Sequence, residues 1–322
     1  MAEKSKISWT DSTLNFWEGC TKVSAGCANC YAEARDKRFT GGKLWGKGAP
    51  RRKSKSAVRA ALAMNRKPWI CDECGKALPA TMHEGRFETC MHYDQSRMHR
   101  RRIFSLSLGD WLDDEVPIEW LAEMLDTIQQ CGDVTWILCT KRPENFQARF
   151  DECGATYRLH PKYQDLVKWL HDWKTGNPPN NIILLTSVEN QEQADKRIPE
   201  LLKIPAACRG LSLEPLLGPV NLESSLALWK PRAYVLEPRN YIDWLIIGGE
   251  SGPNARPCNV DWIRSLVQQG NDSVAATFVK QLGANRENVG LTYTGKFIAD
   301  KKGGDPAEWP ANLQVQQWPK GF

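Results

Sequence analysis

The chain alternates short apolar runs with amphipathic stretches for most of its length. Six runs rich in β-branched residues predict buried strands, and they span residues 102–108, 134–140, 181–187, 209–215, 243–249 and 276–281. An earlier strand is expected near residues 12–19. Helical stretches lie between most of these runs, at residues 117–132, 190–204 and 259–270. The first of them opens with Pro117 and closes on Gly132, as helices commonly do.

This alternation predicts parallel strands joined by right-handed crossovers. With six or seven such units, we expect an α/β fold built on a partial or closed (β/α) barrel. We assign the barrel to residues 1–39 and 103–283. Residues 40–102 hold no strong strand and are assigned to an inserted lobe, and residues 284–322 to a C-terminal extension packed on the barrel.

Composition excludes several classes of protein. The 322 residues are 41% apolar, which is enough for a sizeable core. The chain contains no run of 18 or more apolar residues, so no membrane span is predicted. Its first residues have no apolar stretch typical of a secretory signal. We therefore expect a cytoplasmic protein that does not enter a membrane, and cysteines that remain thiols or bind metals instead of forming disulfides.

Polar residues follow nearly every predicted strand. Residues at the carboxyl ends of barrel strands meet at one mouth, where the active sites of such folds lie. Any one of these polar residues could simply cap the helix that follows its strand. Because polar residues follow six successive strands, we favour an active site. These residues are Ser105, Ser107 and Asp110; Thr140, Lys141 and Arg142; Ser187, Glu189 and Asn190; Ser212 and Glu214; Glu250 and Ser251; Lys280 and Gln281.

Three cysteines follow the first predicted strand, at Cys20, Cys27 and Cys30. A structural zinc ion normally takes four ligands, and no fourth Cys or His lies nearby. Three thiolates suffice for a cubane iron–sulfur cluster whose remaining iron stays open to a substrate or cofactor. A zinc or degenerate structural site is the alternative.

A second cluster lies in the predicted lobe. Cys71 and Cys74 form a CxxC turn with Gly75 behind it, and Cys90 and His92 follow after 15 intervening residues. This Cys₃His set is one that Zn²⁺ accepts readily. Few apolar residues lie between the two halves, so we expect this stretch to need the metal for folding.

Charge is concentrated around the same lobe. Residues 35–102 hold 18 Lys and Arg against 6 Asp and Glu, although the net charge of the whole chain is only +5. A basic block on an acidic body indicates a polyanionic partner, either DNA or RNA; a solvated face without a partner is the alternative. The candidate contacts are Arg51, Arg52, Lys53, Arg100, Arg101 and Arg102.

Several stretches of the chain are distinctive when taken together, among them "GCTKVSAGCANCYA", "LSLGDWLDDEVP", "WILCTKRPEN", "RGLSLEPLLGPV" and "DWLIIGGESGPNARP". In combination they resemble an uncharacterised family of phage and prophage proteins that is placed with the radical S-adenosylmethionine (SAM) barrels. The chain departs from the commonest radical SAM motif, because six residues instead of three separate its first two cysteines. The resemblance implies a [4Fe–4S] cluster that cleaves SAM to a radical, which then abstracts hydrogen from a substrate.

The resemblance also implies roles for residues at the mouth. Cys20, Cys27 and Cys30 would bind iron. Ser105, Ser107 and Asp110 would bind the amino and carboxylate groups of SAM, and Ser187 and Glu189 its ribose. Gly248 and Gly249 would allow a ligand close to the backbone. Lys141, Glu214 and Glu250 are the candidate catalytic residues, and Lys141, Arg142, Arg256 and Lys280 would hold an anionic group.

We therefore expect a radical SAM-type enzyme that modifies or repairs nucleic acid or nucleotides, in the host cytoplasm if phage-encoded. It would need an electron donor, and a protein partner is left open. Two alternatives remain. One is a non-catalytic nucleic-acid-binding protein with structural metals, and the other is a radical SAM enzyme for a small metabolite or peptide.

Overall fold

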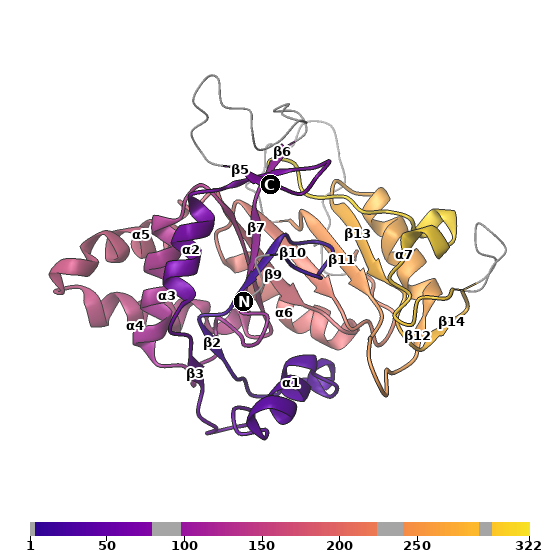
Figure 1. The fold of residues 1–322 in the computed structure, drawn as a ribbon, viewed down its shortest axis with the longest axis horizontal. Helices are drawn as coiled ribbons and strands as arrows, with labels where there is room; N and C mark the ends of the chain where they lie inside the picture. The colour runs from indigo at the N-terminus through magenta and orange to yellow at the C-terminus, as the bar shows by residue number, and fades with distance from the viewer. Residues whose placement is uncertain (1–3, 79–97, 224–240, 290–297) are drawn as a thin grey trace.

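The structure is a computed structural model, and it describes residues 4–78, 98–223, 241–289 and 298–322. Its centre is a curled, seven-stranded parallel sheet that forms a half-barrel (Figure 1). The strands, in spatial order, are β1 (Ser12–Leu14), β7 (Arg102–Ser105), β8 (Thr135–Thr140), β9 (Ile182–Ser187), β10 (Cys208–Leu213), β11 (Trp244–Gly248) and β13 (Ala276–Gln281). The prediction of a partial barrel is confirmed at this level.

Seven helices are described. They are α1 (Tyr31–Thr40), α2 (Ala57–Asn65), α3 (Ile118–Gln130), α4 (Phe146–Tyr157), α5 (Gln164–Lys174), α6 (Gln191–Lys203) and α7 (Val260–Asn271). The three helices expected from the sequence correspond to α3, α6 and α7. The other four were not predicted, although α5 and α2 carry clear apolar positions of their own.

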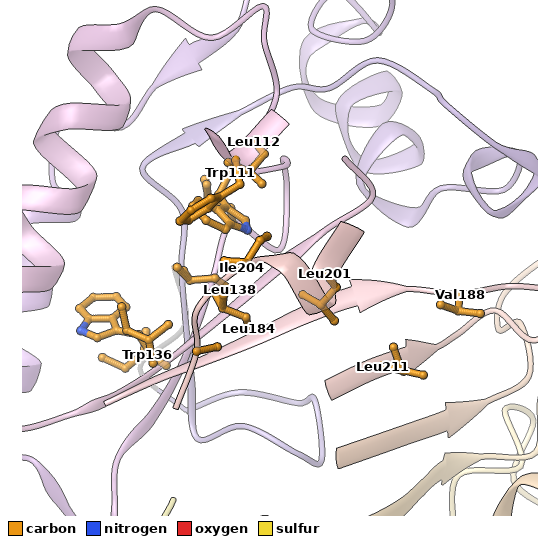
Figure 2. Close-up of a cluster of buried hydrophobic side chains, with 14 of the residues drawn as sticks. Trp111, Leu112, Trp136, Leu138, Leu184, Val188, Leu201, Ile204 and Leu211 are labelled. Carbon is orange, nitrogen blue, oxygen red and sulfur yellow. The ribbon is translucent and has the colours of Figure 1, made fainter. Parts of the chain in front are cut away.

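Strand alternation divides the core into two layers. On one face of the sheet, Leu138 and Leu184 pack with Leu201 of α6 in the main hydrophobic cluster (Figure 2). On the other face, Ile137 and Ile183 belong to a smaller cluster. We call the first of these the outer face, because the helices pack against it, and the second the inner face.

Both ends of the chain fill the inner face. Trp9 packs edge-on against Trp244 with ring centroids 6.1 Å apart, and Trp318 packs against Phe278 at 4.9 Å. The C-terminal segment also pairs with the exposed edge of β13, where the Val279 N–H donates to the Val315 carbonyl at 2.8 Å. The apolar interior is thereby closed, and the polar strand ends are left for the site.

The region assigned to the lobe divides into two parts. Helix α2 buries Ala57 and Ala61 in the main cluster against α3, so it belongs to the barrel. A small antiparallel sheet forms a separate unit, with strands β5 (Ala77–Leu78), β4 (Trp69–Cys71) and β6 (Met98–Arg100). The remaining short pairs are β2 (Trp17–Glu18) with β3 (Arg52–Lys53), and β12 (Cys258–Asn259) with β14 (Arg286–Glu287).

The CxxC segment predicted to bind zinc forms a turn closed by a backbone hydrogen bond. The Gly75 N–H donates to the Cys71 carbonyl at 2.8 Å, and Gly75 adopts a φ of +66° that suits glycine. Cys71 is buried and Cys74 is exposed. Cys90 and His92 lie outside the described residues. In the part of the chain that the structure covers, no helix is long and apolar enough to span a membrane.

The packing of the C-terminal extension leads to a stability prediction. Trp309 is fully buried in the main cluster, and its indole N–H donates to the Gly303 carbonyl at 2.9 Å. Trp309→Ala should lower the free energy of unfolding by about 3–5 kcal/mol, measured as a shift of the urea midpoint. Leu159→Ala is the control, because Leu159 is 83% exposed. Equal stability of the two variants would show that the extension contributes nothing to the core.

Candidate active site

All seven strands of the parallel sheet end at one edge, which we call the mouth. Alternation along the strands brings side chains of the inner face together there. Lys141 follows β8, and its Nζ donates to Ser187 Oγ at 3.0 Å. Lys280 at the end of β13 forms an ion pair with Glu214, which follows β10. The mouth is therefore polar and carries two lysines.

Residues 19–30, which we call the cysteine loop, cross the mouth between β2 and α1. Gly19 begins the loop with a φ of +113°, and a Cβ there would lie 2.6 Å from the Leu44 carbonyl oxygen, so only glycine fits. A short 3₁₀ turn spans Ala25–Cys27, and Cys30 is the N-cap residue of α1. The loop thus joins the three candidate iron ligands to the start of a helix.

Two arginines fasten the first half of the loop. Arg142 pairs with Asp110 at 3.1 Å and donates to the Thr21 carbonyl at 2.7 Å. Arg51 pairs with Asp113 at 2.9 Å and donates to Thr21 Oγ1 at 2.8 Å. Both ion pairs are almost fully buried.

Two more arginine–carboxylate pairs fasten the second half. Arg197 pairs with Glu189 at 2.8 Å, and Glu189 accepts from the Gly26 N–H at 3.1 Å. Arg256 pairs with Glu250 and donates to the Ala25 carbonyl at 2.7 Å. Glu250 also accepts from the Asn29 side-chain amide at 2.9 Å. We call the four pairs the arginine clasps: Arg51–Asp113, Arg142–Asp110, Arg197–Glu189 and Arg256–Glu250.

The three thiols lie against the end of β8. Arg142 Nη1 is 3.6 Å from Cys20 Sγ. Burial raises the pKa of the Cys20 thiol to about 12 and also raises that of Cys30. Burial works to lower the pKa of Lys141, but interactions with acidic groups around it, including Glu189 and Asp110, raise it above its ordinary value. Without a metal, Cys20 and Cys30 would therefore remain protonated at neutral pH beside permanent cations.

The three thiols of the cysteine loop are not arranged to bind a single metal ion. Among the residues that the structure describes, no three His, Cys, Asp or Glu side chains are placed to hold one metal ion. A cubane differs because each thiolate binds a different iron, so its sulfurs do not have to converge on one atom. Metal binding would also replace the thiol protons, and the adjacent arginine and lysine would offset the charge of the resulting thiolates.

Most carboxylates predicted to bind a cofactor are engaged within the protein. Asp110 accepts from Thr140 Oγ1 at 2.7 Å and from the Lys141 N–H at 2.9 Å, in addition to Arg142. Glu189 and Glu250 belong to the arginine clasps. Arg256, proposed from the sequence to hold an anionic group, also belongs to a clasp, and so does Arg142.

One predicted ligand contact is corrected by the backbone. Ser105 aligns with Leu14 and Leu138, which face the outer layer, so the fully buried serine points away from the mouth. Gly249 is already required by packing, because a Cβ there would lie 2.5 Å from the Leu282 carbonyl oxygen. Ser107 and Gly248 lie at the mouth. The carbonyl of Ser107 accepts a hydrogen bond from the Tyr31 hydroxyl.

Three of the six predicted nucleic-acid contacts are buried. The Arg51 side chain is only 1% exposed and holds Asp113. Arg101 is buried and donates to the Lys67 carbonyl at 3.2 Å, and Arg102 is buried with its guanidinium 4.6 Å from the ring centroid of Trp318. These assignments were wrong for a surface role. Of the other three, Arg52 and Lys53 are exposed and Arg100 is partly exposed.

Sequence reasoning missed several residues that shape the site. Asn29 of the loop donates to Glu250, and Asp113 pairs with Arg51. Arg197, which pairs with Glu189, lies on α6, eight residues after that carboxylate. Tyr31 extends to the mouth from the first position of α1. The only sequence signal for these contacts was their closeness to predicted strand ends or to the cysteines.

Comparisons with known proteins give a family but no activity. The family described as "Protein of unknown function (DUF5131)" matches residues 4–307. No curated protein and no solved structure matches the chain. The site must therefore be interpreted from its own chemistry.

The clasp between Arg256 and Glu250 gives a prediction for the loop. Burial works to raise the pKa of Glu250, but hydrogen bonds from Arg256 and Asn29 outweigh it and hold the pKa below the ordinary 4.5. The clasp is therefore complete above pH 4.5 and is lost as pH falls through the lowered pKa. Deuterium uptake by residues 25–30, corrected for intrinsic exchange, should stay low as long as the pH is above the lowered pKa of Glu250. It should rise once the pH falls below that pKa.

Glu250→Gln should make the same residues exchange at least about tenfold faster already at neutral pH, because hydrogen bonds to charged groups contribute about 1.5–3 kcal/mol. Glu152→Gln, at an exposed carboxylate paired with Arg149, is the matched control. Unchanged uptake in Glu250→Gln would mean that this clasp does not hold the loop.

Proposed function

We propose that the chain is a radical SAM-type enzyme with a nucleic-acid or nucleotide substrate. It belongs to the DUF5131 family, whose description gives no function, so the proposal rests on the site itself. One observation carries the proposal. A loop with three cysteines is fastened across the mouth of a parallel half-barrel, against the end of β8. This arrangement combines an iron-binding donor set with the place where β/α barrels carry their chemistry.

The proposed ligands are Cys20, Cys27 and Cys30. When bound, a [4Fe–4S] cluster would supply the electron that cleaves SAM, and the resulting radical would abstract hydrogen from the substrate. The protein contributes position and charge. Arg142 would keep its N–H donor directed at the sulfur of Cys20, and hydrogen bonds to cluster sulfurs raise the reduction potential of such centres.

The inner side chains of the mouth would bind the remaining groups. Lys141 and Ser187 form one pair, and Lys280 and Glu214 form another. A lysine that donates to a serine can exchange that bond for one to a carboxylate or phosphate. We propose that these residues orient SAM and an anionic substrate, with Glu214 as the carboxylate that is not committed to a clasp.

Other parts of the proposal concern partners. A structural zinc ion on Cys71 and Cys74, completed by Cys90 and His92, would hold the small sheet beside the barrel. An electron donor would be required for turnover. The resemblance to phage and prophage proteins favours modification or repair of DNA or RNA.

The proposal predicts the properties of the anaerobically reconstituted protein. Wild type should bind about four irons per chain, absorb broadly in the visible range and release 5′-deoxyadenosine from SAM on reduction. Cys20→Ala, Cys27→Ala and Cys30→Ala should each lower iron content and abolish this release, because a cubane with two protein thiolates is poorly held. Iron content, absorbance and product release are measured together.

Two control variants separate the cluster from general damage. Cys153→Ala removes a thiol buried in α4 and should leave iron and SAM cleavage unchanged. Cys71→Ala/Cys74→Ala should lose zinc but retain iron. Colourless wild-type protein that binds zinc at both cysteine sets would contradict the proposal and support a non-catalytic, metal-stapled protein.

A further inference from the structure

Helix α1 presents an unusual surface directly after the cysteine loop. Tyr31, Arg35 and Phe39 are spaced at i, i+4 and i+8 and therefore lie on one face of the helix. Tyr31 is 60% exposed and Phe39 is 66% exposed. Figure 1 shows α1 at the end of the sheet opposite β5 and β6, where the parallel strands terminate. We call Tyr31, Arg35, Arg38 and Phe39 the α1 stripe.

Cations surround the exposed ring of Phe39. The guanidinium carbon of Arg35 lies 5.6 Å from its centroid, and that of Arg38 lies 5.2 Å away. Such cation–π contacts hold the arginines beside the ring while leaving much of it accessible. An exposed phenylalanine between two guanidinium groups can stack on a flat ring and bind an anion at the same time.

The charge around the stripe is only partly neutralised by neighbours. Arg38 forms no ion pair with a carboxylate of the described residues. Arg35 and Arg52 both pair with the single carboxylate of Glu18, which leaves an excess positive charge, and their side chains remain 45% and 48% exposed. The surface thus favours a polyanion.

The other end of the stripe reaches the mouth. The Tyr31 hydroxyl donates to the carbonyl of Ser107, which follows β7. The ring is therefore fixed at the edge of the mouth, next to the third cysteine.

We propose that the α1 stripe is a track for a single-stranded polynucleotide that leads into the mouth. Tyr31 and Phe39 would stack on bases, and Arg35 and Arg38 would bind the phosphates between them. The two aromatic residues are about 12 Å apart along the helix axis, the length of three to four stacked nucleotides. The track extends the function proposed above by specifying a single strand, because a duplex would hide the base faces.

Fluorescence anisotropy with labelled oligo-dT and oligo-rU tests the track on the full-length protein. Phe39→Ala should weaken binding about tenfold, because alanine substitution at a stacking residue has effects of this size. Arg38→Ala should lower the slope of log K against log salt by about 0.7, the value for one phosphate of a single strand. Both residues are exposed, so folding should be preserved.

Arg158→Ala/Leu159→Ala is the matched control for Arg38→Ala/Phe39→Ala. Each double variant removes one exposed arginine and one exposed apolar residue, and Leu159 is 83% exposed. The control should bind oligonucleotides like wild type. Polyglutamate should compete poorly, because it offers charge but no rings. Equal binding by the two double variants, equal competition by polyglutamate, or no wild-type binding at low salt would overturn the track.

Failure of the track and failure of the enzyme proposal give different results. Iron content and SAM cleavage without nucleic acid should be unchanged in Arg38→Ala/Phe39→Ala. A protein that binds iron and cleaves SAM but shows no stripe-dependent binding would refute the track alone. Stripe-dependent binding by a protein without a cluster would refute the radical chemistry and leave the track in place.

Discussion

Four arginine–carboxylate pairs, three of them almost fully buried, hold the cysteine loop against the mouth of the half-barrel, and the rest of the site depends on them. Removing charges from water is expensive, so such pairs are a poor source of stability. They specify position well, because removing one partner leaves an uncompensated buried charge that costs about 3–5 kcal/mol. In this chain the arginines or their carboxylates also bond to the loop itself, at Thr21, Ala25, Gly26 and Asn29. The loop and the strand ends are therefore built as one unit.

This arrangement determines what chemistry the thiols can carry out. Burial raises the pKa of Cys20 and Cys30, which disfavours a free thiolate nucleophile at neutral pH. A metal overcomes that penalty by replacing the proton, and Arg142 and Lys141 lie where they can offset the charge that results. The same loop ends in α1, whose aromatic and basic surface begins at the mouth. Metal ligation and substrate approach are thus proposed for adjoining stretches of chain.

The sequence predicted the periodic features and missed those that depend on side-chain direction. Repeated apolar runs predicted six of the seven strands of the sheet within a few residues, since buried parallel strands have a strong local pattern. Whether a strand-end residue faces inward depends on register, and a one-residue difference turns Ser105 outward. Arg51 lies in a basic run that suggests a solvent-exposed surface, yet Asp113 draws it inside. Its partner is 62 residues away, so no local pattern could reveal the pair.

The most direct test is Mössbauer spectroscopy of protein reconstituted with ⁵⁷Fe, recorded with and without SAM. If the clasped loop holds the proposed cluster by three thiolates, one iron has no protein ligand. The account predicts that one iron site differs from the other three and that its spectrum changes when SAM is added. Four equivalent irons that do not respond to SAM would show a fully protein-ligated cluster and contradict the central claim.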